Sequence, residues 1–248
     1  MQQYFLPDKV ANIGDVFSLD KSDHHHLFTV LRAQAGEVVQ VVFADQSLML
    51  AEVGDDQATL TVIESLTRQI ELPIDVTIAV GLPKGDKLEF IAQKTTELGA
   101  YELIGFPAKW SVTKLDAKKA SKKTERLQKI VKGAAEQSKR LRIPGVQLLD
   151  SLKALTDLFG NSDVVLVAYE ESAKSDEVSM FTKQLAALNN GASCLVIFGS
   201  EGGISPEEIA VFTQLGAIQI GLGPRIMRAE TAPLYVLSAI SFYTELLK

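Results

Sequence analysis

The sequence predicts an α/β protein in which a small β domain precedes a larger domain built around a parallel sheet. Short apolar or alternating runs separated by turn residues fill the first 65 residues, whereas strands and helices alternate after residue 73. Residues 164–168 and 194–198 are continuous apolar runs, as strands covered on both faces of a parallel sheet require. We expect the two domains to cover residues 1–70 and 71–248.

The composition is that of a soluble globular protein. Apolar residues make up 46% and charged residues 23% of the 248 positions, which excludes disorder as the main state. The single cysteine, Cys194, excludes an internal disulfide and a cysteine-based zinc site, and it indicates a reducing compartment. The N-terminus lacks a targeting pattern, and no apolar run approaches the roughly 20 residues that span a bilayer. We therefore expect a cytoplasmic protein without a membrane partner.

Charge is distributed unevenly along the chain. The net formal charge is −6, but residues 109–142 hold 12 basic and only 3 acidic residues. This segment carries +9 and the remainder −15. A basic patch on an acidic protein predicts a local site for a polyanion.

In the N-terminal region, five short runs read as strands and one segment reads as a helix. Ser22 or Asp23 can cap this helix, Leu27 and Leu31 lie on its apolar stripe, and Gly36 follows its end. Strands at this spacing predict a small barrel or sandwich. The expected strands are residues 3–6, 15–19, 38–43, 48–53 and 58–64.

In the C-terminal region, the motif Ser205-Pro206-Glu207-Glu208 is typical of a helix start, with a serine cap, a proline at the first position and a glutamate three residues after the cap. The helix expected at 122–141 has an apolar face and an opposite basic face that includes Arg126, Lys129, Lys132 and Arg140. The other expected strands are 76–80, 103–106 and 217–222, and the other expected helices are 87–98 and 231–247.

The run His24-His25-His26 superficially resembles a metal site. Consecutive residues on a helix point about 100° apart, so the three rings cannot bind one ion. No cysteine or carboxylate motif with metal spacing accompanies them. We expect structural histidines and no metal.

Three glycine-containing loops follow predicted strands. In 199–203 (Gly-Ser-Glu-Gly-Gly) and 221–225 (Gly-Leu-Gly-Pro-Arg), glycines allow close approach of a ligand, although ordinary tight turns would have the same composition. Arg225 and Arg228 are available for anions, or are simply solvated. Residues 81–87 lack the order of a phosphate-binding loop, and Lys84 and Lys87 either contact a polyanion or face solvent.

Six segments in order along the chain resemble the RsmE family, whose members methylate N3 of a uridine in 16S ribosomal RNA. Ser200 stands where the family commonly has proline, and Ala229 where threonine is common. The matching segments are His25-His26-Leu27 with Val30-Leu31-Arg32 and Gly36-Glu37; 82–87; Gln93-Lys94 with 96–99; 135–138 with Arg140; Gly199 with 201–203; and 222–226 with Arg228 and 230–232.

The resemblance implies a PUA-like β domain that helps bind RNA, followed by a SPOUT-type methyltransferase domain with a deep trefoil knot. General topology rules would exclude such a knot. It also implies S-adenosylmethionine as the cofactor, a homodimer with the cofactor sites near its interface, and 16S rRNA as the partner, in the 30S subunit by analogy.

Site residues follow from the resemblance, from loop position and from residue type. We assign Arg228 or Arg225 to stabilise the uridine anion, and Glu230 to accept the N3 proton. The expected RNA contacts are Arg32, Lys84, Lys87, Arg126, Lys129 and Arg140. The expected cofactor contacts are Phe198, Gly199, Glu201, Gly202, Gly203, Ile220, Leu222, Gly223, Pro224, Ile226, Met227 and Arg228.

Two alternatives remain open at the level of sequence. One is another SPOUT-class RNA methyltransferase that modifies a ribose or a different base. The other is a non-catalytic RNA-binding factor in ribosome assembly, which would bind RNA but no cofactor.

Overall fold

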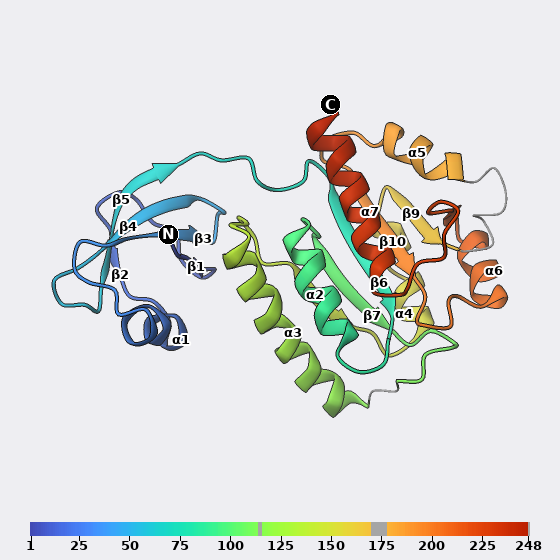
Figure 1. Cartoon of the computed structure of the whole chain (residues 1–248), viewed down its shortest axis with the longest axis horizontal. Helices are drawn as coiled ribbons and strands as arrows, with labels where there is room; N and C mark the ends of the chain where they lie inside the picture. Colours follow the sequence, from blue (N-terminus) through green and yellow to red (C-terminus); the bar gives the residue numbers. More distant parts are fainter. Residues whose placement is uncertain (114–115, 170–177, 248) are drawn as a thin grey trace. The chain divides into compact units, whose positions relative to one another are not determined.

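The computed structural model describes residues 1–113, 116–169 and 178–247. Contacts within the chain divide it into two compact units, which are coloured by sequence in Figure 1. The first unit comprises Met1–Glu71 and Ala135–Ile143, and the second comprises Leu72–Ala134 and Pro144–Lys248. The segment 135–143 therefore packs with a unit from which it is distant in sequence.

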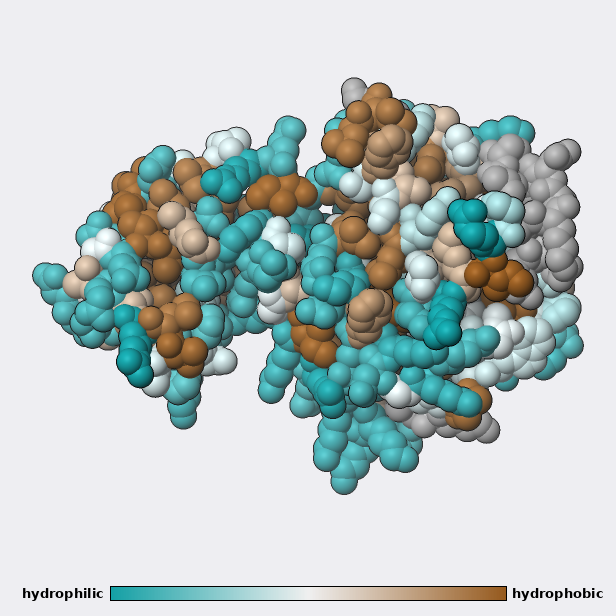
Figure 2. All heavy atoms as spheres, viewed as in Figure 1, coloured by the Kyte–Doolittle hydropathy of each residue, from teal (hydrophilic) through white to brown (hydrophobic). Residues whose placement is uncertain are grey.

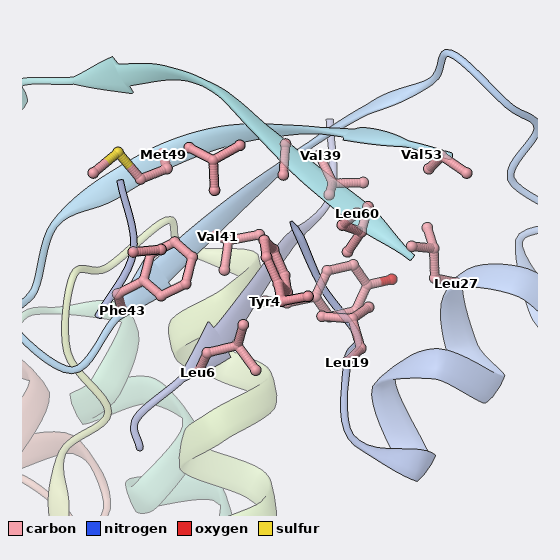
Figure 3. Close-up of a cluster of buried hydrophobic side chains, with 14 of the residues drawn as sticks. Tyr4, Leu6, Leu19, Leu27, Val39, Val41, Phe43, Met49, Val53 and Leu60 are labelled. Carbon is pink, nitrogen blue, oxygen red and sulfur yellow. The ribbon is translucent and has the colours of Figure 1, made fainter. Parts of the chain in front are cut away.

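The first unit contains a five-stranded sheet in the order β1-β3-β4-β5-β2. The β1–β3 pair is parallel and the other pairs are antiparallel. Its apolar core gathers side chains from the strands and from the neighbouring helical segment, among them Tyr4, Val41, Leu60 and Leu27 (Figure 3). The strands are β1 (Gln3–Leu6), β2 (Val16–Phe17), β3 (Val38–Phe43), β4 (Leu48–Val53) and β5 (Leu60–Leu66).

The helical segment of the first unit begins earlier than predicted. Asp20, rather than Ser22 or Asp23, caps α1 (Lys21–His24), because its carboxylate accepts both the Ser22 and the Asp23 backbone N–H at 2.8 Å. The segment continues as a π-helix over His25–Val30. Strand β2 is shorter than the expected range 15–19, and β5 begins and ends two residues later than the expected range 58–64.

A buried ion pair attaches residues 135–143 to the first unit. Arg140 is only 3% exposed, and its Nε lies 3.1 Å from Glu71 Oε2. The backbone N–H of Leu141 donates to the same carboxylate at 2.8 Å, and Gln3 Nε2 donates to the Arg140 carbonyl at 2.6 Å. This buried position does not fit the phosphate contact expected for Arg140, because its guanidinium is already paired and out of reach of solvent.

The second unit contains a six-stranded sheet in the order β11-β9-β10-β6-β7-β8, and every pair is parallel. Helices flank this sheet in Figure 1. The parallel sheet predicted from the apolar runs is confirmed, whereas β8 was not anticipated. The strands are β6 (Asp75–Gly81), β7 (Glu102–Phe106), β8 (Gly145–Leu148), β9 (Val164–Ala168), β10 (Ser193–Phe198) and β11 (Ile218–Ile220).

The predicted capping box at the start of α6 is confirmed. Ser205 Oγ accepts the Glu208 backbone N–H at 3.2 Å, and Glu208 Oε2 accepts the Ser205 N–H at 2.8 Å. The helices are α2 (Lys87–Glu97), α3 (Ala117–Gln137), α4 (Leu152–Thr156), α5 (Val178–Ala187), α6 (Pro206–Gln214) and α7 (Thr231–Ser241), with a short 3-10 turn at Phe159–Asn161 and a π-helical turn at Phe242–Leu246.

Two helical predictions need correction. Helix α3 starts at Ala117 and ends at Gln137 instead of spanning 122–141, and the left-handed φ of 64° at Lys139 prevents its continuation. Helices α4 and α5 were not predicted. None of the helices formed by the described residues is long and apolar enough to cross a membrane.

The strand order brings three loops to one edge of the sheet. Strand β10 lies between β9 and β6, so the chain that runs from β6 outward through β7 and β8 later returns to the other side of β6. Since all strands are parallel, the carboxyl ends of β6, β10 and β11 lie at the same edge. This switch in strand order is where open α/β sheets bind ligands.

Candidate active site

One lysine connects the three loops at this edge. Lys87, the first residue of α2, follows the loop after β6, and its Nζ lies 3.0 Å from Glu201 Oε1 in the loop after β10. The same Nζ lies 3.5 Å from Glu230 Oε2 in the loop before α7. The backbone N–H of Lys84 also donates to Glu201 Oε1 at 3.0 Å. Glu201 and Glu230, which are far apart in sequence, therefore share one ammonium group.

Electrostatics favour the charged form of this cluster. The hydrogen bond to Glu201 raises the pKa of Lys87, against the smaller opposing effect of desolvation. Desolvation acts to raise the pKa of Glu201, but the hydrogen bonds from the Lys84 N–H and from Lys87 outweigh it and lower the pKa overall. The raised pKa of Lys87 and the lowered pKa of Glu201 both keep this pair ionised across the neutral pH range.

The loop after β10 is shaped by direct backbone approach. A Cβ placed on Gly199 would stand 2.2 Å from the Gly203 carbonyl carbon, and a Cβ on Gly81 would stand 2.7 Å from the Ser200 backbone nitrogen. The Gly203 N–H donates to the Ser200 carbonyl at 2.9 Å and closes the turn. Gly81 and Gly199 are thus required by packing within the protein.

The same loop leaves one polar group unsatisfied. Ser200 is 4% exposed, and no described residue forms a hydrogen bond with its Oγ. Glu230 Oε2, in the loop before α7, is also buried, and its charge is balanced by Lys87 Nζ at 3.5 Å. An orphaned hydroxyl such as that of Ser200 is expected where a polar ligand completes a site.

The loop after β11 is more open. Gly223 has a left-handed φ of 99°, and nothing lies within 4 Å of the position of a Cβ there. Arg225 and Arg228 are exposed, and no described residue forms a hydrogen bond or an ion pair with either guanidinium. The Arg228 carbonyl accepts the N–H of Thr231 at 2.9 Å, which fixes its backbone at the start of α7.

The structure brings some of the predicted cofactor residues together at this edge. Phe198 and Ile220 are buried at the carboxyl ends of β10 and β11, whereas Ile226 is 80% exposed. The loop after β10 contributes Gly199, Glu201, Gly202 and Gly203, and the loop after β11 contributes Leu222, Gly223, Pro224, Met227 and Arg228.

The predicted RNA contacts differ in their surroundings. Lys84 and Lys129 are exposed, and Arg32 is exposed in the first unit. Arg126 is exposed but pairs with Glu89 at 2.6 Å, and Lys87 is engaged as described above. Only part of the basic set is therefore unpaired among the described residues.

The loop after β7 packs beside the candidate site, and the sequence indicates only that Lys109 begins the basic segment 109–142. Lys109 N–H donates to Glu208 Oε1 at 2.7 Å, and Lys109 Nζ lies 2.9 Å from Glu207 Oε1. Thr113 Oγ1 donates to the Pro83 carbonyl at 2.9 Å. The one signal in the sequence that could identify this loop as part of the site is the single tryptophan, Trp110, directly after Lys109.

Within the described ranges, no group of three or more histidine, cysteine, aspartate or glutamate side chains is arranged to hold a metal ion. His24 packs on Phe28 with ring centroids 4.6 Å apart. His26 Nδ1 lies 3.1 Å from the Tyr4 hydroxyl. These two rings contact neighbours within the first unit.

Comparisons with known proteins agree over the whole chain. A family profile described as an RNA methyltransferase domain matches residues 70–241, and one described as an RNA methyltransferase PUA domain matches residues 19–63. The chain is 46% identical to the ribosomal RNA small subunit methyltransferase E of Bacillus subtilis, over 100% of this chain and 99% of the relative. It is 32% identical to the Mycobacterium bovis protein of the same name, over 97% and 91%.

A solved structure shares the fold. The crystal structure of the ribosomal RNA small subunit methyltransferase E from Neisseria gonorrhoeae, bound to S-adenosyl methionine, superposes with a TM-score of 0.82 at 24% identity. The match covers 98% of each chain.

The close approach at Gly199 predicts a large loss of stability on adding one methyl group. Gly199→Ala should lower the free energy of unfolding by about 3 kcal/mol, because the new Cβ meets backbone atoms that cannot yield cheaply. Urea denaturation measures this change. Gly133→Ala on α3, where a Cβ meets nothing within 4 Å, is the control and should be neutral or stabilising. Equal effects of the two substitutions would contradict the packing argument.

Proposed function

The chain belongs to the RsmE family of ribosomal RNA small subunit methyltransferases, and we propose that it transfers a methyl group from S-adenosylmethionine to N3 of a uridine in 16S rRNA. The observation that carries the proposal is the Lys87–Glu201–Glu230 cluster, which ties together the three loops at the carboxyl edge of the parallel sheet. The knotted path of the chain is an expectation from the family, and action in the cytoplasm is an expectation from the sequence.

The residues at this edge fit the cofactor. S-adenosylmethionine supplies an activated methyl group on a sulfonium sulfur. It also carries a carboxylate, an amino group and ribose hydroxyls, which need hydrogen-bond partners. The orphaned Ser200 Oγ, the Glu201 and Glu230 carboxylates and the backbone of the two glycine loops offer such partners. Leu222 and Met227, which are partly exposed, offer apolar surface for the adenine. Phe198 and Ile220 are buried and support the loops from within the sheet.

Arg228, Arg225 and Glu230 suit the proton chemistry of the target base. Uridine N3 carries a weakly acidic imide proton, and its removal leaves an anion. Arg228, with Arg225 as the second choice, stabilises this anion, because neither guanidinium is engaged by a described residue. Glu230 accepts the proton directly or through water, and Lys87 holds its carboxylate in place. Positioning and charge account for most of the protein's contribution.

The exposed basic residues suit contacts with the phosphates of the RNA. Lys84, Lys129 and Arg32 are exposed, and Arg126 and Lys87 add charge while paired with Glu89 and with Glu201. Binding through such contacts weakens steeply with salt. The assembled 30S subunit is the proposed form of the substrate.

Helix α7 supports a homodimer. Its buried face includes Val236 and Ile240, yet Tyr235 (41%) is exposed. In the π-helical turn that continues α7, Phe242 (53%) and Leu246 (74%) are exposed as well. Tyr235 and Phe242 are seven residues apart, about two helical turns, and therefore point in nearly the same direction. Figure 2 shows hydrophobic side chains gathered at the C-terminal end of α7. A helix that is apolar on both faces is stable in water when both faces are buried. We propose that a second copy of the chain buries the exposed face.

The reaction is tested with 30S subunits lacking the modification and methyl-labelled S-adenosylmethionine, followed by nucleoside analysis. Wild-type protein should yield 3-methyluridine. Arg228→Ala and Glu230→Gln should lower kcat about a hundredfold, because each removes a group that acts on the N3 proton or the resulting anion. Methyl label on a ribose or another base would identify a different SPOUT-class activity. RNA binding without cofactor binding or turnover would identify an assembly factor.

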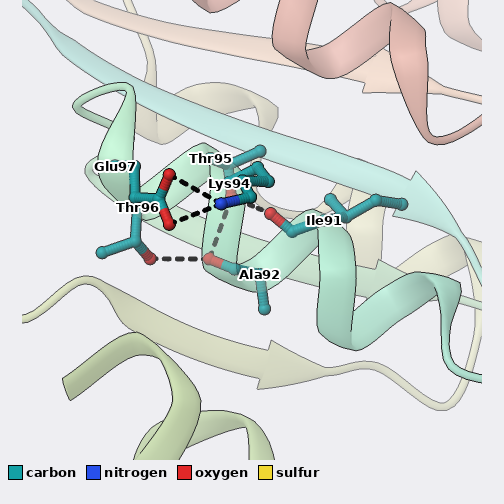
Figure 4. Close-up of polar contacts among 6 residues, drawn as sticks. All are labelled: Ile91, Ala92, Lys94, Thr95, Thr96 and Glu97. Carbon is teal, nitrogen blue, oxygen red and sulfur yellow. Dashed lines mark hydrogen bonds and ion pairs between the residues drawn. The ribbon is translucent and has the colours of Figure 1, made fainter. Parts of the chain in front are cut away.

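The proposal that Lys87 holds the cofactor loops together is tested by comparing substitutions of Lys87 and Lys94. Both lysines lie on α2 with side chains 35% exposed, but among the described residues Lys94 forms an ion pair with Glu97 alone, on its own helix (Figure 4). Lys87→Met should weaken binding of S-adenosylmethionine about tenfold, since it frees two loops and leaves two carboxylates unbalanced. Lys94→Met should leave the Kd unchanged in calorimetric titration. The proposal fails if the two variants behave alike.

The dimer is tested by sedimentation of Phe242→Glu. A carboxylate on the exposed face should convert the wild-type dimer to a folded monomer, because the interface would bury an unpaired charge. Val211→Glu on α6, where the side chain is 40% exposed, is the control and should remain dimeric. A monomeric wild-type protein would rule out the homodimer.

A further inference from the structure

The chain's single tryptophan lies on the glycine loop of the candidate site. A Cβ placed on Gly202 would stand 2.9 Å from Trp110 Cβ and 3.5 Å from its Cγ and Cε3. The nearest ring atom to the corresponding position on Gly203 is Cζ3, at 4.0 Å. The indole therefore rests against Gly202 and Gly203, which have no side chains to cover it. Trp110 remains 45% exposed, although it is the largest apolar side chain in the protein.

Hydrogen bonds and an ion pair on both sides of Trp110 hold it in this place. Lys109 is fixed to the first turn of α6 through its backbone N–H to Glu208 and its ammonium to Glu207. The Ser111 N–H donates to the Ala108 carbonyl at 2.9 Å, and Thr113 Oγ1 reaches the Pro83 carbonyl next to Lys84. The ring is thus positioned before any ligand binds, which lowers the entropy cost of binding to it.

The surroundings of Trp110 match what unpaired nucleotides bind. Proteins that recognise single-stranded RNA combine basic groups that follow the phosphates with aromatic rings on which splayed bases stack. Here the ring belongs to a loop that a hydrogen bond anchors next to Lys84, an exposed basic residue that can follow the phosphates. Val112, 66% exposed, extends the apolar surface. A purely structural tryptophan would bury more of its area.

We infer that Trp110 is a stacking platform for an unpaired base of the RNA substrate, at the edge of the methyl-transfer site. This inference rests on the proposed function and narrows its substrate class to RNA with an unstacked nucleotide at the target position. A duplex offers no free base face to the ring. The adenine of the cofactor is the competing occupant, and the experiment separates the two.

The lone tryptophan makes the first measurement direct, because all tryptophan emission reports on this position. Titration with a short oligouridine should quench the emission, since a base stacked on the indole changes its excited state. Polyphosphate, which carries the charges without bases, should bind the lysines and leave the emission unchanged. Quenching by S-adenosylmethionine alone, with none by oligouridine, would assign the ring to the cofactor and overturn the inference.

Variants provide the second measurement. Trp110→Ala should raise the KM for 30S subunits about tenfold, while kcat and the Kd for S-adenosylmethionine stay within twofold of wild type. Trp110→Phe retains a ring and should restore most of the affinity, which a loss of folding would not allow. Leu215→Ala is the control, because it removes an exposed apolar side chain at the end of α6 opposite to the first turn that holds Lys109, about 13 Å along the helix axis.

The outcomes distinguish this inference from the proposed function. Normal methylation by wild type with an unchanged KM in Trp110→Ala would reject the stacking platform and leave the activity intact. Absence of methylation by wild type would reject the function itself. A rise in KM for Leu215→Ala equal to that for Trp110→Ala would show that no specific stacking contact exists.

Discussion

The parallel pairing of β10 with β6 is the constraint on which the rest of the second unit depends. In this register Phe198 lies opposite Val80, so Gly199 and Gly81 emerge from the sheet side by side. A side chain on either residue would meet backbone, at 2.2 Å from Gly203 or 2.7 Å from Ser200. If the pairing of β10 with β6 slipped by one residue, Phe198 or Val80 would take the place of a glycine where the two loops leave the sheet, and its side chain would fill the space that the loops need. The two loops can leave the sheet together only in the observed register.

The Lys87 cluster depends on this pairing in turn. Glu201 comes within reach of α2 because the loop after β10 leaves the sheet next to the loop after β6, and Glu230 arrives from beyond β11. A lysine suits the position, because one compact ammonium with three donors can serve carboxylates that approach from different directions. A planar guanidinium would favour two oxygens of one carboxylate. The cluster thus fixes the positions of the loops and also balances the charge of two carboxylates. Methyl transfer needs both a positioned site and a balanced charge.

Local signals were predictable from the sequence, and long-range partners were not. The Ser205–Glu208 capping box and the apolar strands β9 and β10 were correct because their determinants lie within a few residues. The cap of α1 was misassigned because Asp20, Ser22 and Asp23 are all competent, and only the backbone geometry selects Asp20. Sequence alone predicts a phosphate contact for Arg140, because its actual partner, Glu71, lies 69 residues earlier in the chain. The contact of Trp110 with Gly202 was invisible for the same reason.

Long-range pairing also changes the meaning of the basic segment 109–142. Counted from the sequence it carries +9, but Lys109 pairs with Glu207 and Arg126 with Glu89, both acids from outside the segment. Arg140 is likewise neutralised by Glu71. The acidic partners in these pairs lie outside residues 109–142, so the charge of +9 counted for the segment leaves them out. The positive electrostatic potential of this segment is therefore weaker than the sequence indicates. An RNA bound there releases fewer counterions than twelve unpaired basic residues would imply. Binding that depends less on bulk charge requires contacts with bases, which is the role that the exposed indole of Trp110 is suited to fill.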